Sequence, residues 1–92
     1  MLKAQEKLWL NELKIDFPQY SESIDLLGRE VEQFLELAED YYFCKAEIKA
    51  LEKSGGSTLL YAFTEVFEDL REEIRLMILE REVNLHYPKG LK

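Results

Sequence analysis

Side chains suited to nucleophilic chemistry are scarce in this chain, which contains one Cys and one His, Cys44 and His86. Nucleophilic catalysis by Ser, Thr or Cys needs a general base within hydrogen-bond reach, and a single His leaves little choice of partner. A reactive thiol needs cationic neighbours or a helix N-terminus. Cys44 instead follows residues 41–43, which are all aromatic, and it borders an apolar stripe. We therefore interpret it as a small buried residue and predict no catalytic residue and no enzymatic activity.

The spacing closest to a metal-ligand pair joins Glu82 to His86, four residues apart on one helix face. A carboxylate-bridged metal bundle needs repeated Glu-x-x-His motifs that point inward, and this pair does not supply them. A His at the negative end of a helix is more simply a capping residue. The Gly-containing turn at residues 53–57 has no carboxylate for calcium, and it does not join a strand to a helix as a phosphate loop does. The sequence therefore predicts neither a metal site nor a cofactor.

Carboxylates are numerous, so pairs of them on one helix face are expected by chance. Four stand close together in the middle of the chain: Glu32, Glu36, Glu39 and Asp40. General acid–base catalysis needs a carboxyl group whose pKa is shifted by burial in a cleft, and nothing in the sequence removes these four from water. We interpret them as a solvated helix face, which is also a candidate surface for a basic protein partner.

Charge and composition limit the classes of partner and the cellular locations that fit this chain. Nineteen acidic and twelve basic residues give a net charge of −7, which disfavours nucleic acid and anionic membranes as partners. The first residues lack the apolar core of a signal peptide, and no window approaches the roughly 20 apolar residues of a membrane span. A lone Cys has no partner for an internal disulfide. We therefore expect an acidic, soluble, cytoplasmic protein without membrane contact.

The longest helical pattern covers residues 18–53. Its apolar residues recur at spacings of three, four and seven over about four heptads, with Lys45 at the one polar position of the stripe. The apolar members are Ile24, Leu27, Val31, Phe34, Ala38, Tyr41 and Ile48. Asp16 can cap the start of this helix and Pro18 fits its first turn, while the Gly-Gly pair in the predicted turn 54–57 ends it.

A second helical pattern covers residues 58–86 and carries a similar stripe. Its members are Leu60, Phe63, Phe67, Leu70, Ile74 and Met77. The two helices must lie antiparallel because the turn is short, and pairing about this turn places Lys45 opposite Glu68. Residues 2–14 form a shorter helix that turns back along the open end of the hairpin. The predicted fold is one all-α domain, a long antiparallel helical hairpin with a short N-terminal helix.

Gly28 lies inside the predicted helix 18–53, where Gly costs about 1 kcal/mol relative to Ala. Two interpretations are open. Gly28 marks a close crossing with another helix, such as one at a dimer axis, or it is a tolerated weak point one turn after a frayed start. The aromatic residues near the turn are also open to two interpretations, as a bulky core or as a binding patch. These are Tyr41, Tyr42, Phe43, Tyr61, Phe63 and Phe67.

Self-association is the function that the sequence favours. The later half of the helix 58–86 is apolar nearly all round, and a helix of this kind is buried on several sides. One short N-terminal helix cannot cover it, so we expect a second copy to do so, with two hairpins forming a four-helix bundle. The predicted interface residues are Leu76, Leu79 and Val83, followed by Phe34 and Leu37.

The hypothesis is therefore a non-enzymatic helical interaction module that works as a homodimer. The first alternative is a small regulator or chaperone-like protein whose apolar faces and acidic surface bind a different, basic protein. Such a complex would be sensitive to salt. The second alternative is a helical bundle that binds a small ligand or a metal ion.

Overall fold

A computed structural model describes the backbone of residues 2–86 and the side chains of residues 2–84. Over this range the chain is all-α, as predicted. The elements are α1 (Ala4–Asp16), the 3₁₀ turn η1 (Pro18–Tyr20), α2 (Ser21–Glu30), α3 (Glu32–Ser54) and α4 (Ser57–His86). The N-terminal helix was expected at 2–14 and the last helix at 58–86, so both lie within two residues of their predicted bounds.

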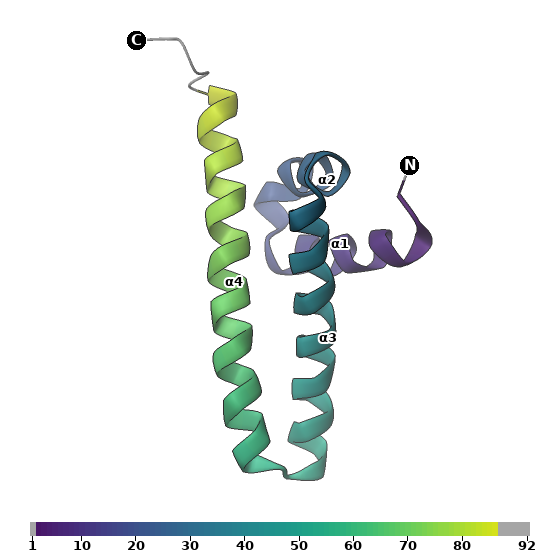
Figure 1. Cartoon of the computed structure of the whole chain (residues 1–92), viewed down its shortest axis with the longest axis vertical. Helices are drawn as coiled ribbons and strands as arrows, with labels where there is room; N and C mark the ends of the chain where they lie inside the picture. Colours follow the sequence, from purple (N-terminus) through teal and green to yellow (C-terminus); the bar gives the residue numbers. More distant parts are fainter. Residues whose placement is uncertain (1, 87–92) are drawn as a thin grey trace.

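α3 and α4 lie side by side and run in opposite directions (Figure 1). Gly55 ends α3 with a φ of 78°, a left-handed conformation that Gly adopts without steric cost. The Gly55 N–H donates to the carbonyl oxygen of Leu51 at 2.9 Å, which satisfies one of the last carbonyl groups of the helix. The chain therefore reverses within two residues before Ser57 begins α4.

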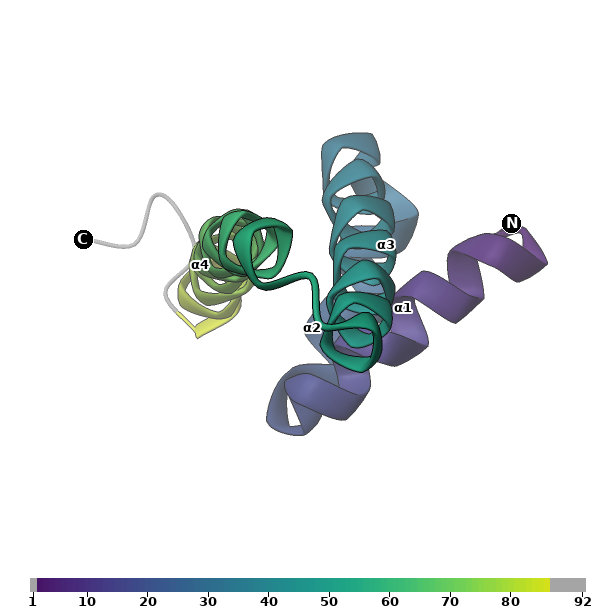
Figure 2. The ribbon, with the colours of Figure 1, turned by 90° about the horizontal axis from the view of Figure 1, so that it is seen from below.

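α1 and α2 pack on the same side of the α3–α4 pair (Figure 2). α1 contacts mainly α3, and α2 contacts both long helices. Two polar contacts hold α2 to α4: buried Ser23 donates a hydrogen bond to Glu82, and Arg81 Nη1 lies 3.0 Å from Glu30 Oε1. No other helix of the described chain covers the opposite side of the pair.

The prediction of one helix over 18–53 is wrong, because the chain leaves helical geometry at Val31, with φ −124° and ψ 105°. The Val31 N–H still bonds Leu27 O at 2.8 Å, and its carbonyl accepts from Phe34 N at 3.0 Å. A β-branched residue adopts this extended geometry readily. The break redirects α2 across the end of α3, which lets Ile24 and Leu27 join the core.

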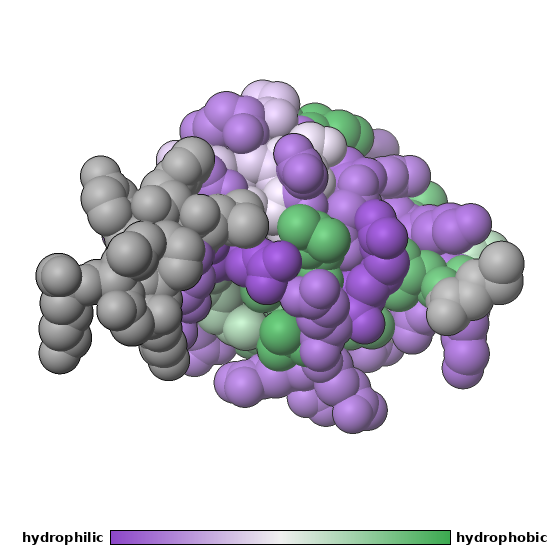
Figure 3. All heavy atoms as spheres, turned by 90° about the horizontal axis from the view of Figure 1, so that it is seen from above, coloured by the Kyte–Doolittle hydropathy of each residue, from purple (hydrophilic) through white to green (hydrophobic). Residues whose placement is uncertain are grey.

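The core lies where α1 and α2 meet the long helices. It consists of Leu10, Leu13, Phe17, Ile24, Leu27, Phe34, Leu37, Ala38, Tyr41, Ile74 and Ile78. Several large apolar residues remain about half exposed or more elsewhere: Leu8, Ile15, Phe43, Leu59, Tyr61, Val66, Leu76 and Val83. Apolar side chains are visible among polar ones at the end of the molecule where α2 crosses (Figure 3). Within residues 2–86, no helix combines the length and the hydrophobicity needed to cross a bilayer.

Gly28 lies where α1 crosses α2. A Cβ atom built on Gly28 would stand 2.4 Å from Leu10 Cδ1 and 3.0 Å from Leu10 Cδ2, closer than van der Waals contact allows. Leu10 is 2% exposed, so its side chain has little room to move away. Gly28 therefore marks a close helix crossing, as one of the two interpretations held, but the crossing helix is α1 of the same chain.

We predict that Gly28→Ala lowers the free energy of unfolding by roughly 1–2 kcal/mol in urea denaturation. The steric cost of overpacking, typically about 1–3 kcal/mol, exceeds the gain of about 1 kcal/mol in helix propensity. The same substitution should become stabilising in a Leu10→Ala background, because the methyl group then enters the space that Leu10 vacates. A Gly28→Ala variant at least as stable as wild type would contradict the close crossing.

Candidate interaction surfaces

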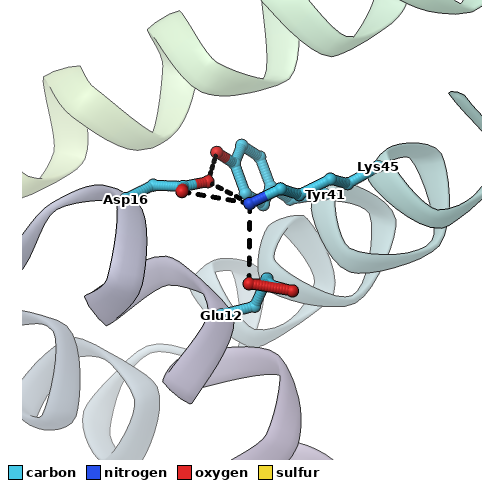
Figure 4. Close-up of polar contacts among 4 residues, drawn as sticks. All are labelled: Glu12, Asp16, Tyr41 and Lys45. Carbon is cyan, nitrogen blue, oxygen red and sulfur yellow. Dashed lines mark hydrogen bonds and ion pairs between the residues drawn. The ribbon is translucent and has the colours of Figure 1, made fainter. Parts of the chain in front are cut away.

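A cluster of four polar side chains joins the end of α1 to the middle of α3 (Figure 4). Lys45 Nζ lies 2.8 Å from Asp16 Oδ2 and 3.0 Å from Asp16 Oδ1, and 3.5 Å from Glu12 Oε2. The Tyr41 hydroxyl donates a hydrogen bond to the Asp16 carboxylate. Tyr41 is 1% exposed, and its ring packs against Phe67 of α4 with 4.7 Å between centroids. The cluster therefore fixes α1 against α3, and the ring of Tyr41 in turn packs α3 against α4.

Two sequence interpretations fail at this cluster. Asp16 was expected to cap the following helix, but it ends α1, and η1 has no side-chain cap. Lys45 was expected to face Glu68, but it pairs with Asp16 and Glu12 instead. The sequence did contain a signal, because Lys45 is the one polar residue on an apolar stripe and needs a counter-charge from another element.

The cluster shifts the protonation equilibria of two of its members. Burial alone would raise the pKa of the Asp16 carboxyl, but hydrogen bonds from Lys45 and Tyr41, with the charges of Lys45 and Arg71, lower it below its ordinary value. Burial and the neighbouring Asp16 carboxylate raise the pKa of Tyr41 above its ordinary value. At neutral pH Asp16 is therefore ionised and Tyr41 is protonated, and each state is held by its hydrogen bonds. This arrangement suits a structural clamp.

Cys44 lies between α3 and α4, where its Sγ donates to the carbonyl oxygen of Phe63 at 3.4 Å. The residue is 7% exposed. Burial, together with the nearby charge of Asp40, raises the pKa of the Cys44 thiol. The protonated, hydrogen-bonded thiol is a packing group, because the thiolate is the nucleophilic form.

The structure separates the five residues predicted for the interface. Phe34 and Leu37, at 0% and 8% exposure, belong to the core of their own chain, because α1, α2 and α4 enclose that side of α3. Leu76 and Val83 of α4 are 52% and 55% exposed, and Leu79 is partly buried. The α4 residues can therefore contact a second copy at the surface, whereas Phe34 and Leu37 are buried in their own chain and cannot.

The predicted acidic face lies on α3 and is largely exposed. Glu32, Glu36 and Asp40 are exposed, and Glu39 is partly buried. None of the four belongs to an ion pair among residues 2–84. Within the same described part of the chain, no group of three or more acidic, His or Cys residues is placed to hold a metal ion. Glu82 of the suggested metal pair accepts the Ser23 hydrogen bond, and the side chain of His86 lies outside the described residues.

The uncovered side of the α3–α4 pair contains a groove of about 380 Å³ that sequence reasoning did not identify. Its lining residues are Asp40, Phe43, Cys44 and Glu47 from α3, with Phe63, Val66 and Leu70 from α4. Phe43 is 57% exposed and Val66 is 51% exposed. Acidic residues on both sides of Phe43 along α3 give this apolar groove a negative rim. The sequence signal was the aromatic run at 41–43, in which Tyr41 faces the core and Phe43 faces the groove.

We predict that Asp16→Asn lowers the free energy of unfolding at pH 7 by roughly 1–3 kcal/mol, since a partly buried ammonium group loses its closest counter-charge. The pKa of Asp16 is lowered by folding, so its stabilisation is present above the unfolded value near 3.8 and is lost as the pH falls through the folded value. The difference between wild type and variant should therefore shrink in acid. Urea denaturation from pH 7 downward measures it.

Glu52→Gln is the control for this experiment, because Glu52 is an exposed α3 carboxylate without an ion pair among the described residues. The free energy of unfolding of the Glu52→Gln variant should stay within about 0.5 kcal/mol of the wild-type value. If Asp16→Asn behaves like Glu52→Gln at every pH, the cluster does not clamp α1.

No known family, curated protein or solved structure matches the chain. A function for it must therefore come from its own geometry and chemistry.

Proposed function

We propose that the chain is a non-enzymatic helical interaction module that forms a homodimer through the outer face of α4. The observation that carries this proposal is the exposure of Leu76 and Val83, at 52% and 55%. With Leu79 they are spaced three and four residues apart, the spacing by which one helix packs along another. None of the three belongs to the core of its own chain or to the apolar residues packed against that core.

Burial of such residues favours association. Full burial of a Leu or Val side chain contributes about 1.5–3 kcal/mol, and a half-exposed one contributes a corresponding fraction. In a dimer with two-fold symmetry, each copy contributes the same three residues, Leu76, Leu79 and Val83, to the interface. In such a dimer the two α3–α4 pairs provide the four long helices of a bundle, with α1 and α2 on its outside.

The absence of a catalytic role is part of the same proposal. Cys44 is held as a protonated thiol by burial and by the Phe63 carbonyl group. Asp16 and Tyr41 hold each other in fixed protonation states. These contacts support structural roles for the groups that would otherwise be candidates for chemistry. A reducing, cytoplasmic location suits a chain with one buried thiol.

The regulator that binds a basic partner remains a second candidate, and the groove between α3 and α4 favours it. Neither Leu76 nor Val83 lines the groove, so both activities are compatible in one molecule.

We predict that wild-type protein at low micromolar concentration has twice the 10.9 kDa chain mass. The double variant Leu76→Glu/Val83→Glu should have the mass of one chain, because it places charges where apolar contacts form. Its dimer dissociation constant should rise at least about 100-fold, which corresponds to about 2.7 kcal/mol. Sedimentation velocity over a concentration series, with native mass spectrometry, measures this constant.

Leu8→Glu/Ile15→Glu is the matched control, because it adds the same two charges at exposed apolar positions of α1. This control should remain dimeric. Circular dichroism should show that both double variants keep their helical content. A wild-type monomer up to about 100 µM, or a dimer that survives Leu76→Glu/Val83→Glu, would rule out the proposed interface.

A further inference from the structure

The groove on the uncovered side of the α3–α4 pair is an apolar feature that the dimer proposal leaves unused. Phe43 and Val66 stand on its two sides, each more than half exposed. Leu59 precedes Val66 by seven residues, so it extends the apolar line along the same face of α4, and it is 58% exposed. Large apolar side chains from both long helices, Phe43 on α3 and Val66 and Leu59 on α4, therefore border a groove that no helix of the described chain fills.

The charges around this groove all have one sign. Asp40 and Glu47 line it, and no Lys or Arg does so. Helical spacing extends the pattern, because Glu36 lies seven residues before Phe43 and Glu73 lies seven residues after Val66. Both of these residues are also exposed. The cation nearest in sequence, Lys45, points to the other side of α3, where Asp16 and Glu12 hold it.

The negative charge around the groove decides which kind of molecule can bind there. A second copy seated on the same face would bring carboxylates against carboxylates around a two-fold axis, which opposes association. A partner with basic residues at the edges of an apolar strip would instead pack this strip on the apolar residues of the groove and pair its charges with Asp40 and Glu47. Electrostatic complementarity of this kind favours a positively charged protein segment over self-association.

The dimensions of the groove favour a helix as that segment. The face of α4 that bears Leu59 and Val66 runs from Leu59 to the acidic Glu73, which is roughly 21 Å at about 1.5 Å per residue. A third helix can lie between two side-by-side helices when its side chains enter the groove that they form. A helix of about 14–18 residues therefore spans the site.

We propose that this groove binds an amphipathic basic helix from another protein. The apolar strip of that helix packs on Phe43, Val66 and Leu59, and its flanking Lys or Arg residues pair with Asp40 and Glu47. The site is separate from the α4 residues proposed for the dimer, so each proposal can fail without the other.

The test uses the full chain and a fluorescein-labelled helical peptide of about 18 residues built from Leu and Lys. A peptide of the same composition in scrambled order keeps the charge and removes the apolar strip, and a Leu–Glu analogue reverses the charge. Fluorescence anisotropy should show that the amphipathic basic peptide binds at least about tenfold more tightly than either control peptide. Raising NaCl from about 50 to about 500 mM should weaken its binding about tenfold or more.

Two charge-reversal variants locate the site. Asp40→Lys/Glu47→Lys should weaken the basic peptide at least about tenfold and should gain affinity for the Leu–Glu analogue. Glu65→Lys/Glu68→Lys makes the same charge change at exposed positions beside Tyr61, outside the residues that line the groove, and it should affect the basic peptide much less. Circular dichroism checks that both variants remain folded.

Two outcomes would overturn the proposal. Equal effects of the two charge-reversal pairs would mean that the peptide binds the acidic surface in general. A dimer that is strengthened or broken by Asp40→Lys/Glu47→Lys, while Leu76→Glu/Val83→Glu has no effect, would mean that a second copy occupies the groove. Loss of the dimer in Leu76→Glu/Val83→Glu with peptide binding unchanged would support both proposals independently.

Discussion

Lys45 carries an ammonium group on the side of α3 that is otherwise apolar, and its side chain is only 22% exposed. A buried cation without a counter-charge would cost several kcal/mol, so another element must supply carboxylates at this point. Asp16 and Glu12 supply them from the C-terminal half of α1. α1 can therefore dock with only this part against the middle of α3. That placement covers one side of the α3–α4 pair and leaves the groove side open.

The tight crossing at Gly28 depends on the same placement. α1 reaches α2 with Leu10 pressed against the Gly28 backbone, where any other residue would hold the two helices apart. The ion pair between Lys14 and Asp25, at 2.5 Å, joins the two helices beside that crossing. Sterics and charge thus act on the same small region. The open side of the long helices follows from how the N-terminal third is fixed.

Much of this architecture could be predicted from the spacing of apolar residues and the position of the glycines in the sequence. The helical spacing of residues 58–86 and the Gly55-Gly56 pair placed α4 and the turn to within one or two residues. The break at Val31 was not predictable in this way, because a heptad stripe has the same spacing whether or not the helix bends at one residue. Asp16 was misassigned for a related reason. Its nearest partners in sequence suggested a cap, whereas its actual partners lie 25 and 29 residues away.

The candidate surfaces show a second limit of spacing arguments. An apolar stripe indicates that a helix face is buried, but it does not say which neighbour buries it, so Phe34 and Leu37 were assigned to another chain when their own chain covers them. The aromatic run at 41–43 was left as core or binding patch, and the structure divides it. Tyr41 is core, and Phe43 is surface. Tyr41 is covered by Asp16 of α1 and Phe67 of α4, and the spacing of the aromatic run alone does not show this.

The contacts between α2 and α4 have a consequence for the order in which the chain assembles. Ser23 and Glu82 are 59 residues apart, and Glu30 and Arg81 are 51 apart, whereas α3 and α4 meet through a two-residue turn. Closing a long loop costs more entropy than closing a short one, so long-range contacts form late. During synthesis on the ribosome, α1 can reach its partners on α3 before α4 exists, but α2 cannot complete its packing until Arg81 and Glu82 have emerged. The packing of α2 is therefore completed only after the later half of α4 has formed.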